Sequence, residues 1–293
     1  MTTTPAGRAQ LSVGATTVTY IPDGHGSFST SFAFPQADWQ DFAAYVDADG
    51  RITLSFGAFL IRSGDDAVLV DLGVGAVDLE LPGIGHVRGG ALVRNLAAEG
   101  VAPADIGTVV YTHLHSDHVG WTSDVAPDPF MTQARPGSPV LTFPNARYRV
   151  AGKEWSYWSG NDLFGGPDPY AVLKPLADSI DFVADGDTIA PGVTVRAMPG
   201  HTPGHLAIAV ADPAGTDSVT IVIAGDCLHS PIQLAAPGLR FASDVDPGQA
   251  EITRAALLRQ TSAVIAAGHF PGHVFGRADR SGGRVNWVPV HNR

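Results

Sequence analysis

Four side chains that can bind metal lie within six residues: His113, His115, Asp117 and His118. Because His113 and His115 are two residues apart, their side chains point the same way wherever the chain is extended. Asp117 and His118 follow as the chain begins to turn, so they can face a second centre. Imidazole nitrogens and carboxylate oxygens together suit a borderline metal such as zinc. A chance cluster or a hydrogen-bonded surface loop is the alternative interpretation.

Three more candidate ligands occur far along the chain, and each stands beside a glycine after an apolar run. They are His201, Asp226 and His269, after the runs 193–197, 219–224 and 263–267. Any one alone is weak evidence, because a histidine after Pro-Gly, or an aspartate after glycine, is usually a turn residue. Together with the 113–118 cluster, at four predicted strand ends, they indicate a metal site.

The first half of the chain predicts strands with one helix between them. Apolar runs indicate strands at 16–21, 52–61, 67–71 and 106–110. Apolar residues at helical spacing predict a helix over 89–100, with Gly100 as its C-terminal cap. Asp71 ends a strand before a glycine turn, where it would cap the turn or hold the metal loop through a hydrogen bond. This order is expected of an α/β (α+β) arrangement.

The second half repeats the pattern of strand, ligand loop and helix. Strands are predicted at 193–197, 206–211, 219–224 and 263–267, and an amphipathic helix at 247–260. No domain linker is visible, so we expect a single domain over 1–293. Within it, residues 1–50 form an N-terminal extension and 121–190 a loop-rich insertion near the active site.

Two aromatic-rich segments are candidates for a substrate wall. The insertion carries Trp155, Tyr157, Trp158 and other aromatics among many prolines, and loops beside reactive residues often contact substrate. Its alternative role is to pack down onto the body of the protein. Residues 22–50 hold Phe28, Phe32, Phe34 and Trp39, for which core packing is the favoured interpretation and a pocket wall the alternative.

Composition narrows the classes of partner. The formal charge is −11, from 29 acidic and 18 basic residues, which argues against a nucleic-acid partner and against anionic membrane surfaces. The single cysteine, Cys227, allows no internal disulfide, so nothing requires an oxidising compartment. The N-terminal residues lack the apolar core of an export signal, and no run reaches membrane-spanning length. We therefore expect a soluble cytoplasmic protein.

The combined pattern resembles the metallo-β-lactamase superfamily, whose signature is His-x-His-x-Asp-His followed by a distant His, Asp and His. The resemblance covers roughly residues 52–275. It implies a four-layer αββα sandwich with metals in a cleft at the sheet edges. By the family's motif, His113, His115 and His201 would hold one metal and Asp117, His118 and His269 the other, with Asp226 bridging the two.

Two positions require a choice between neighbouring histidines. In the run from Pro199 to His205 the family's ligand is the first histidine, so His201 is preferred and His205 would lie in the core or behind the ligands. His269 is preferred to His273 because it directly follows a strand.

The resemblance also indicates a subgroup. Asp226 disfavours those lactam-hydrolysing members that carry Cys at this position. His115 disfavours the redox di-iron members, which carry Glu there. The runs 225–229, 241–247 and 269–274 resemble the methyl parathion hydrolase and N-acyl homoserine lactone lactonase group. In that group the residue three after the bridging Asp faces the substrate, and here it is His229.

The implied activity is hydrolysis of a lactone or ester carbonyl by a hydroxide shared between two divalent metal ions. Zinc is the first expectation, with manganese, iron and cobalt open. Asp117 would shuttle the proton, and His229 would donate a hydrogen bond to the oxyanion. The expected partner is a small-molecule substrate, and exposed apolar residues of the insertion would allow a homodimer.

Three alternative activities stay open at this point. A phosphotriester (organophosphate) hydrolase would use the same dinuclear site with a roomier apolar pocket built from Trp121, Phe130, Trp155 and Trp158. A glyoxalase II-like thioesterase needs basic residues for glutathione, and these are sparse. A mononuclear iron dioxygenase is a further option.

Overall fold

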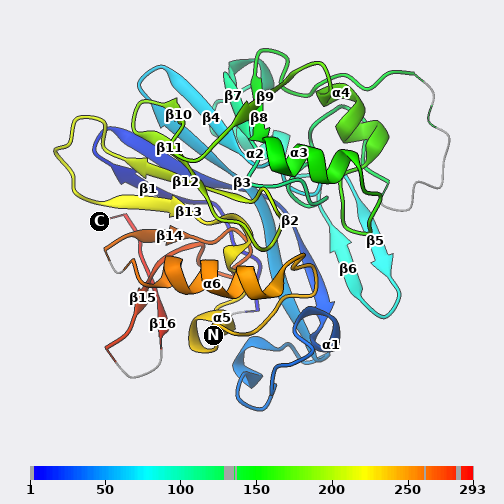
Figure 1. The fold of residues 1–293 in the computed structure, drawn as a ribbon, viewed down its shortest axis with the longest axis vertical. Coiled ribbons are helices and arrows are strands. Elements are labelled where there is room, and N and C mark those ends of the chain that lie inside the picture. The colour runs from blue at the N-terminus through cyan, green and yellow to red at the C-terminus, as the bar shows by residue number, and fades with distance from the viewer. Residues whose placement is uncertain (1–2, 129–134, 136, 261, 282–284, 293) are drawn as a thin grey trace.

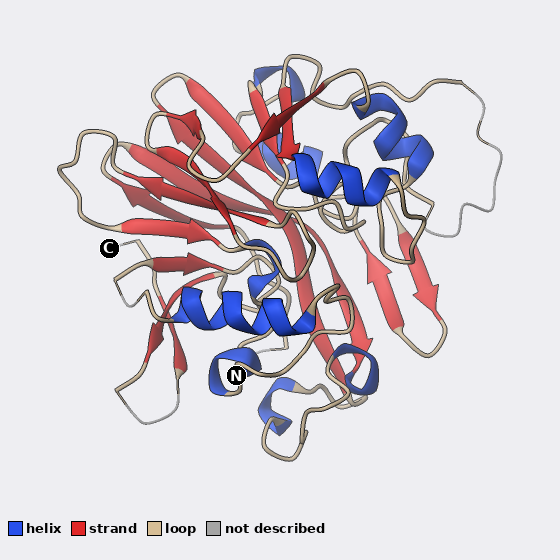
Figure 2. Cartoon of the chain, viewed as in Figure 1, coloured by secondary structure: helices blue, strands red, loops and turns tan. Residues whose placement is uncertain are grey.

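The computed structural model describes residues 3–128, 135, 137–260, 262–281 and 285–292. Two mixed β-sheets pack face to face, and helices lie on their outer sides (Figures 1 and 2). The four-layer arrangement predicted from the family resemblance is confirmed.

The first sheet has the strand order β5-β6-β2-β3-β4-β7-β8-β9, with β1 pairing to β2. Its strands are β1 (Ala9–Val13), β2 (Thr16–Ser29), β3 (Arg51–Ser63), β4 (Asp66–Val70), β5 (Asp78–Leu81), β6 (Gly85–Arg88), β7 (Thr108–Val110), β8 (Arg147–Ala151) and β9 (Ile180–Val183). The neighbours β4, β7, β8 and β9 run parallel. Parallel strands end at the same edge of a sheet, so Asp71 and the 111–118 loop emerge side by side.

The second sheet has the strand order β10-β11-β12-β13-β14-β15-β16. Its strands are β10 (Thr188–Ala190), β11 (Val193–Ala197), β12 (Leu206–Ala211), β13 (Thr220–Ile223), β14 (Val264–Ala266), β15 (Phe275–Asp279) and β16 (Asn286–Pro289). β13 and β14 run parallel, so the loops that carry Asp226 and His269 leave the same edge. The turn from β11 to the antiparallel β12 carries His201 to that edge as well.

Helices cover both outer faces. α2 (Leu92–Ala98) and α3 (Gly152–Ser159) pack against the first sheet, and α6 (Pro247–Leu258) packs against the second. A buried cluster that includes Tyr20, Phe59 and Phe275 fills the space between the sheets. Shorter helices are α1 (Thr30–Ala33), α4 (Lys174–Leu176) and α5 (Ile232–Ala235), with single helical turns at Ala43–Tyr45, Pro103–Asp105, Pro169–Leu173 and Gly225–Cys227.

Two segments contribute more to the sheets than their sequences indicate. The predicted strand at 16–21 continues to Ser29, so much of the N-terminal extension is a central part of the first sheet. Within the 121–190 segment, β8 and β9 complete the same sheet. The sequence of this irregular segment does not reveal these short strands, because β8 and β9 gain their stability from pairing in the sheet rather than from local sequence.

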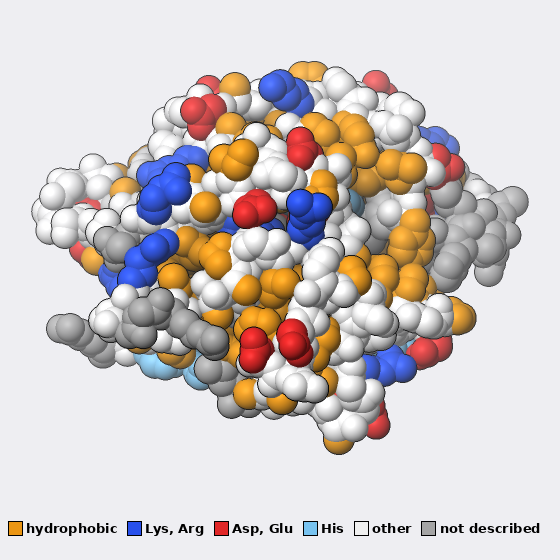
Figure 3. Space-filling model, turned by 60° about the horizontal axis from the view of Figure 1, so that its bottom comes forward, with side chains coloured by type: hydrophobic (Ala, Val, Ile, Leu, Met, Phe, Trp, Pro, Cys, Tyr) orange, Lys and Arg blue, Asp and Glu red, His pale blue; other side chains and the backbone are white. Residues whose placement is uncertain are grey.

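The surface bears scattered apolar groups. Figure 3 shows hydrophobic side chains on one face in several groups separated by polar and charged side chains. Exposed examples in the described residues include Phe164, Phe182 and Ile252. The homodimer stays a prediction. Among the described residues, no helix has the length and apolar character needed to cross a membrane.

Candidate metal centre

The loop after β7 is fixed by Asp71, the residue that follows β4. Asp71 accepts hydrogen bonds from the backbone N–H of Thr112 at 2.7 Å and from its hydroxyl at 2.8 Å. Asp71 adopts the left-handed region with φ 61°, which is costly for a residue other than glycine. This conformation turns its carboxylate toward the loop, as one of the two interpretations of Asp71 predicts.

One group of four buried donors lies at the sheet edge: His113, His115, His201 and Asp226. Their ligand atoms all lie within 4.8 Å of one another. Nδ1 of His115 is 3.0 Å from Nε2 of His113 and 2.8 Å from Nε2 of His201. Oδ2 of Asp226 is 3.1 Å from Nε2 of His201. The nitrogens therefore converge on one point beside a carboxylate oxygen, which we call the first subsite.

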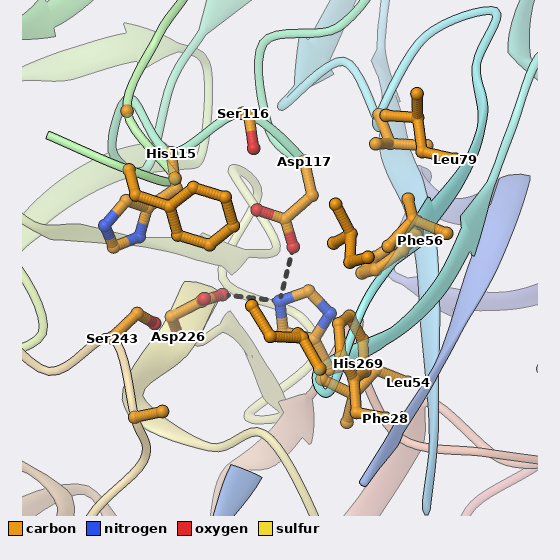
Figure 4. Close-up of a pocket in the computed structure, with 18 of the residues that line it drawn as sticks. Phe28, Leu54, Phe56, Leu79, His115, Ser116, Asp117, Asp226, Ser243 and His269 are labelled. Carbon is orange, nitrogen blue, oxygen red and sulfur yellow. Dashed lines mark ion pairs between the residues drawn. The ribbon is translucent and has the colours of Figure 1, made fainter. Parts of the chain in front are cut away.

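A second group adjoins it, formed by Asp117, His118 and His269, whose ligand atoms also lie within 4.8 Å of one another. Nε2 of His118 and Nε2 of His269 are 3.2 Å apart. The other oxygen of Asp226, Oδ1, is 3.1 Å from Nε2 of His118 and 2.9 Å from Nε2 of His269. Figure 4 shows His269 between Asp226 and Asp117. Asp226 thus presents one oxygen to each group, and the second group is called the second subsite.

Hydrogen bonds behind the rings fix their orientation. Nδ1 of His118 donates to Asp71 and Nδ1 of His201 donates to Asp244, each at 2.9 Å. Nδ1 of His269 donates to the carbonyl of Ser55, also at 2.9 Å. Because each of these partners accepts a hydrogen bond from the Nδ1–H group, the lone pair on Nε2 is free to face the centre.

This arrangement fits metal ions. Oδ1 of Asp226 is buried and accepts no well-formed hydrogen bond from the described residues, although the nitrogen of His269 lies close to it. Imidazole nitrogens that face one another at this spacing repel unless a proton or a cation lies between them. A buried carboxylate oxygen that lacks a well-formed hydrogen bond and is surrounded by such nitrogens belongs to the kind of donor set that a divalent cation satisfies.

The histidines of the first subsite differ in the direction in which their pKa is shifted. Burial, together with neighbouring histidines, lowers the pKa of His113 and His115 well below the usual range, so both are neutral. Burial also opposes charge on His201, but the carboxylates of Asp226 and Asp244 outweigh it and raise the pKa of His201 to about 9. Metal binding at this site would therefore compete with protons.

The histidines left out of the two groups have different surroundings. Nε2 of His205 accepts a hydrogen bond from the backbone N–H of Asp226 at 2.9 Å, while its Nδ1 donates to the carbonyl of Met198. His205 therefore supports Asp226 from behind, as its predicted place behind the ligands implies. His273 is exposed, and its ring pairs with that of His291.

His229 lines a cavity that is also lined by Asp117, Asp226 and His269. It is fully buried and stacks on Phe241, with ring centroids 3.8 Å apart. Its Nε2 is 3.1 Å from Oδ2 of Asp226. Burial lowers the pKa of His229 to about 4, which keeps the ring neutral.

The cavity has a volume of about 220 Å³ and opens from the two subsites between apolar walls (Figure 4). The walls include Phe28, Phe32, Leu54, Phe56, Leu79 and Phe164. Figure 4 places Phe28, Leu54, Phe56 and Leu79 on the side of His269. Thus Phe28 and Phe32 line the pocket, the alternative interpretation of the 22–50 aromatics, and they also pack in a core cluster, the favoured one. Phe34 and Trp39 do pack in a core cluster.

The tryptophans named for the alternative phosphotriester pocket do not line this cavity, although Phe164 of the same insertion does. Trp121, Trp155 and Trp158 pack in the cluster under the outer helices and are absent from the cavity lining. The indole N–H of Trp121 donates to Asp23, and that of Trp158 donates to Glu154. Such buried hydrogen bonds hold the rings in the body of the protein. Phe130 lies outside the described residues.

Three residues that contact the ligand loops are not predicted from the sequence: Asp244, Ser55 and Glu154. The β5–β6 hairpin in the cavity wall is not predicted either. Asp244 lies in the run 241–247, and the resemblance of that run to the family is the one sequence signal for it. Ser55 acts through its backbone carbonyl, so its residue type carries no signal.

Comparisons with known proteins agree with this geometry. The chain is 31% identical over 175 residues to a probable metallo-hydrolase of Mycobacterium tuberculosis, a match that covers 54% of this chain and 53% of that protein. The chain therefore spans about half the length of that relative. It is 27% identical over 248 residues to the N-acyl homoserine lactonase AttM of Azorhizobium caulinodans, which covers 76% of this chain and 84% of that protein.

Two solved structures share the fold over nearly the whole chain. The dizinc quorum-quenching lactonase AidC superimposes with a TM-score of 0.80 at 22% identity, covering 97% of this chain and 98% of that one. The hydrolase AbOPH also gives 0.80, at 26% identity, covering 98% and 99%. The family model described as the metallo-beta-lactamase superfamily matches residues 58–269. The chain belongs to the metallo-beta-lactamase superfamily.

Proposed function

We propose that this chain is a two-metal hydrolase that cleaves lactones or carboxylic esters bearing an apolar arm. One observation carries the proposal: two adjoining donor groups share Asp226 and open into an apolar cavity. The relative named as an N-acyl homoserine lactonase and the fold shared with a dizinc lactonase support it.

In this proposal His113, His115 and His201 would hold one ion, and Asp117, His118 and His269 would hold the other. Asp226 would serve both donor groups. Two divalent cations in these positions would supply a water of lowered pKa and would polarise the carbonyl.

Asp117 has the most exposed side chain of the seven candidate ligands, at 24%. It lines the cavity, so it can reach both water and substrate. A carboxylate in this place can take the proton from the attacking water and deliver it to the leaving oxygen. We assign that proton transfer to Asp117.

His229 is neutral and lines the same cavity beside Asp226. Its Nε2 lies 3.1 Å from Oδ2 of Asp226, the carboxylate that both subsites share. We assign to it a hydrogen bond to the oxygen that gains negative charge as the carbonyl is attacked, a contribution of about 3 kcal/mol for one such donor.

The cavity favours these substrates over the alternatives. Its apolar walls would accommodate an alkyl or aryl arm on the side of His269. Among its lining residues, all from the described part of the chain, there is no lysine or arginine to pair with the carboxylates of glutathione. The tryptophans proposed for a phosphotriester pocket lie elsewhere. A mononuclear iron oxygenase would have no need of the second subsite.

Metal content and hydrolysis test the proposal together. Purified protein should contain about two equivalents of metal by plasma mass spectrometry, and should hydrolyse lactones or esters in a chelator-sensitive manner. The screen includes a phosphotriester and a glutathione thioester. About one equivalent of iron without hydrolysis, or a preference for the phosphotriester or thioester, would reject the proposed activity.

A further inference from the structure

Glu154 is a fully buried carboxylate near the start of α3 (Figure 1), and it joins two separate loops. Its Oε1 accepts hydrogen bonds from the backbone N–H of Leu114 at 3.0 Å and the indole N–H of Trp158 at 2.8 Å. Its Oε2 accepts from the hydroxyl of Thr202 at 2.7 Å and the backbone N–H of Gly204 at 3.0 Å. All four lone-pair positions of the carboxylate are thereby used.

These donors lie next to the histidines of the first subsite. Leu114 stands between His113 and His115, and Thr202 directly follows His201. The ring of Trp158 meets His115 edge to face, with centroids 5.2 Å apart. Glu154 therefore touches a neighbour of every histidine in the first subsite.

We propose that Glu154 is the positioning residue of the first subsite. It fixes the separation of the loop that carries His113 and His115 from the loop that carries His201, and so sets the affinity of that subsite for its ion. The inference rests on the two-metal function proposed above. None of its four donors adjoins Asp117, His118 or His269, the nearest being Leu114, three residues before Asp117, so we expect the second subsite not to depend on it.

The loop that carries Thr202 and Gly204 packs closely against the backbone of Glu154. A Cβ atom on Gly204 would lie 2.2 Å from the backbone nitrogen of Glu154, so glycine permits the loop to approach α3. An ionised carboxylate is the side chain that offers acceptors only. A glutamine of the same size would turn its NH2 group toward two donors, and would lose hydrogen bonds to one of the loops.

The test is a titration with Zn²⁺ against a chromogenic chelator, using metal-free protein. The wild-type protein should bind two ions. The substitution E154Q should lower the affinity for one ion about tenfold or more, the range found for residues that hold metal ligands from behind. The affinity for the other ion should stay unchanged. A loss of stability alone would not separate the two affinities in this way.

Double variants identify the weakened subsite. In a His269→Ala background the first subsite remains, and adding E154Q should weaken the remaining ion. In a His201→Ala background the first subsite is already damaged, so adding E154Q should change little. The opposite pattern would assign Glu154 to the second subsite and overturn the proposal.

Thr202→Val removes one of the four hydrogen bonds and leaves the carboxylate in place. It should weaken the same ion to a smaller degree, and it keeps the test available if E154Q does not fold. Asp212→Asn is the matched control, because Asp212 also accepts four hydrogen bonds but lies at the far end of β12. It should leave both affinities unchanged.

Unchanged affinities in both E154Q and T202V, or equal weakening of both ions, would overturn the role of Glu154. Failure of the proposed function looks different. If the wild-type protein binds one ion, the two-metal hydrolase is rejected, while weaker binding of that ion in E154Q would still support the role of Glu154.

Discussion

Asp244 accepts a hydrogen bond from Nδ1 of His201 across 2.9 Å, and its other oxygen lies 3.7 Å from the guanidinium of Arg254. The side chains of all three residues are almost fully buried. Burial alone would raise the pKa of Asp244, but the hydrogen bond and charge of His201 keep it below its usual value. Asp244 therefore stays ionised and holds His201 with its Nε2 toward Asp226.

Replacing this carboxylate should disturb one metal ion. We expect Asp244→Ala to weaken binding of one Zn²⁺ ion about tenfold to a hundredfold, because the ring of His201 loses its orientation. Competition titration measures the change. Asp246→Asn is the control, since Asp246 is exposed and caps α6 two residues further on. Wild-type affinity in Asp244→Ala would contradict this role.

His229 should affect rate rather than metal content. We expect His229→Ala to keep two equivalents of metal and to lose about a hundredfold in kcat on a lactone, because one donor to the oxyanion is removed. Metal analysis and steady-state kinetics on the same preparation check both parts. His273→Ala, at an exposed histidine, should match the wild type. An unchanged kcat in His229→Ala would remove His229 from the mechanism.

The sequence predicts the strands and loops that carry the candidate ligands well, because those features are local. The strand at 206–211 and the helix starting at Pro247 match the structure closely. The family motif groups His113 with His201, and the structure brings their rings to a centroid separation of 4.8 Å. Apolar runs that end at glycine and histidine contain this information in a few adjacent residues.

Buried carboxylates are harder to predict, because their partners are distant backbone groups. Asp23 accepts hydrogen bonds from the N–H groups of Val74, Gly75 and Leu92 and from the indole of Trp121. Nothing in the residues near Asp23 indicates these donors. The same holds for Glu154, and for the β5–β6 hairpin, whose role in the cavity wall depends on pairing with β2.

The apolar wall should select substrates by the size of their arm. Leu79 on β5 faces the cavity, so Leu79→Trp should fill part of it (Figure 4). We expect kcat/KM for a long-chain lactone to fall about tenfold, which corresponds to the free energy of burying roughly two methylene groups. The kcat/KM for a short-chain lactone should change little. Glu80→Trp on the exposed side of the same strand is the control. Equal losses for both chain lengths would contradict selection by this wall.

Asp212 makes stability depend on acid pH at a place remote from the metal centre. Its carboxylate accepts hydrogen bonds from the hydroxyl of Thr216 and from the backbone N–H groups of Ala214, Thr216 and Asp217. These bonds lower its pKa from 3.8 to about 2, the hydroxyl of Thr216 having the largest effect. The folded state thus binds the proton less tightly than the unfolded state. Its stabilising effect is complete above the unfolded pKa and is lost as the pH falls toward the folded one.

Asp212→Asn should therefore be less stable than the wild type at pH 7, and the difference should shrink as the pH falls from about 4 toward 2. Urea unfolding midpoints measured on metal-free protein over a pH series, down to the lowest pH at which both proteins fold, give the comparison. Asp217→Asn is the matched control in the same turn, because its carboxylate accepts one backbone hydrogen bond, from Val219. A difference that stays constant or widens with acid would show that the charge of Asp212 does not stabilise this turn.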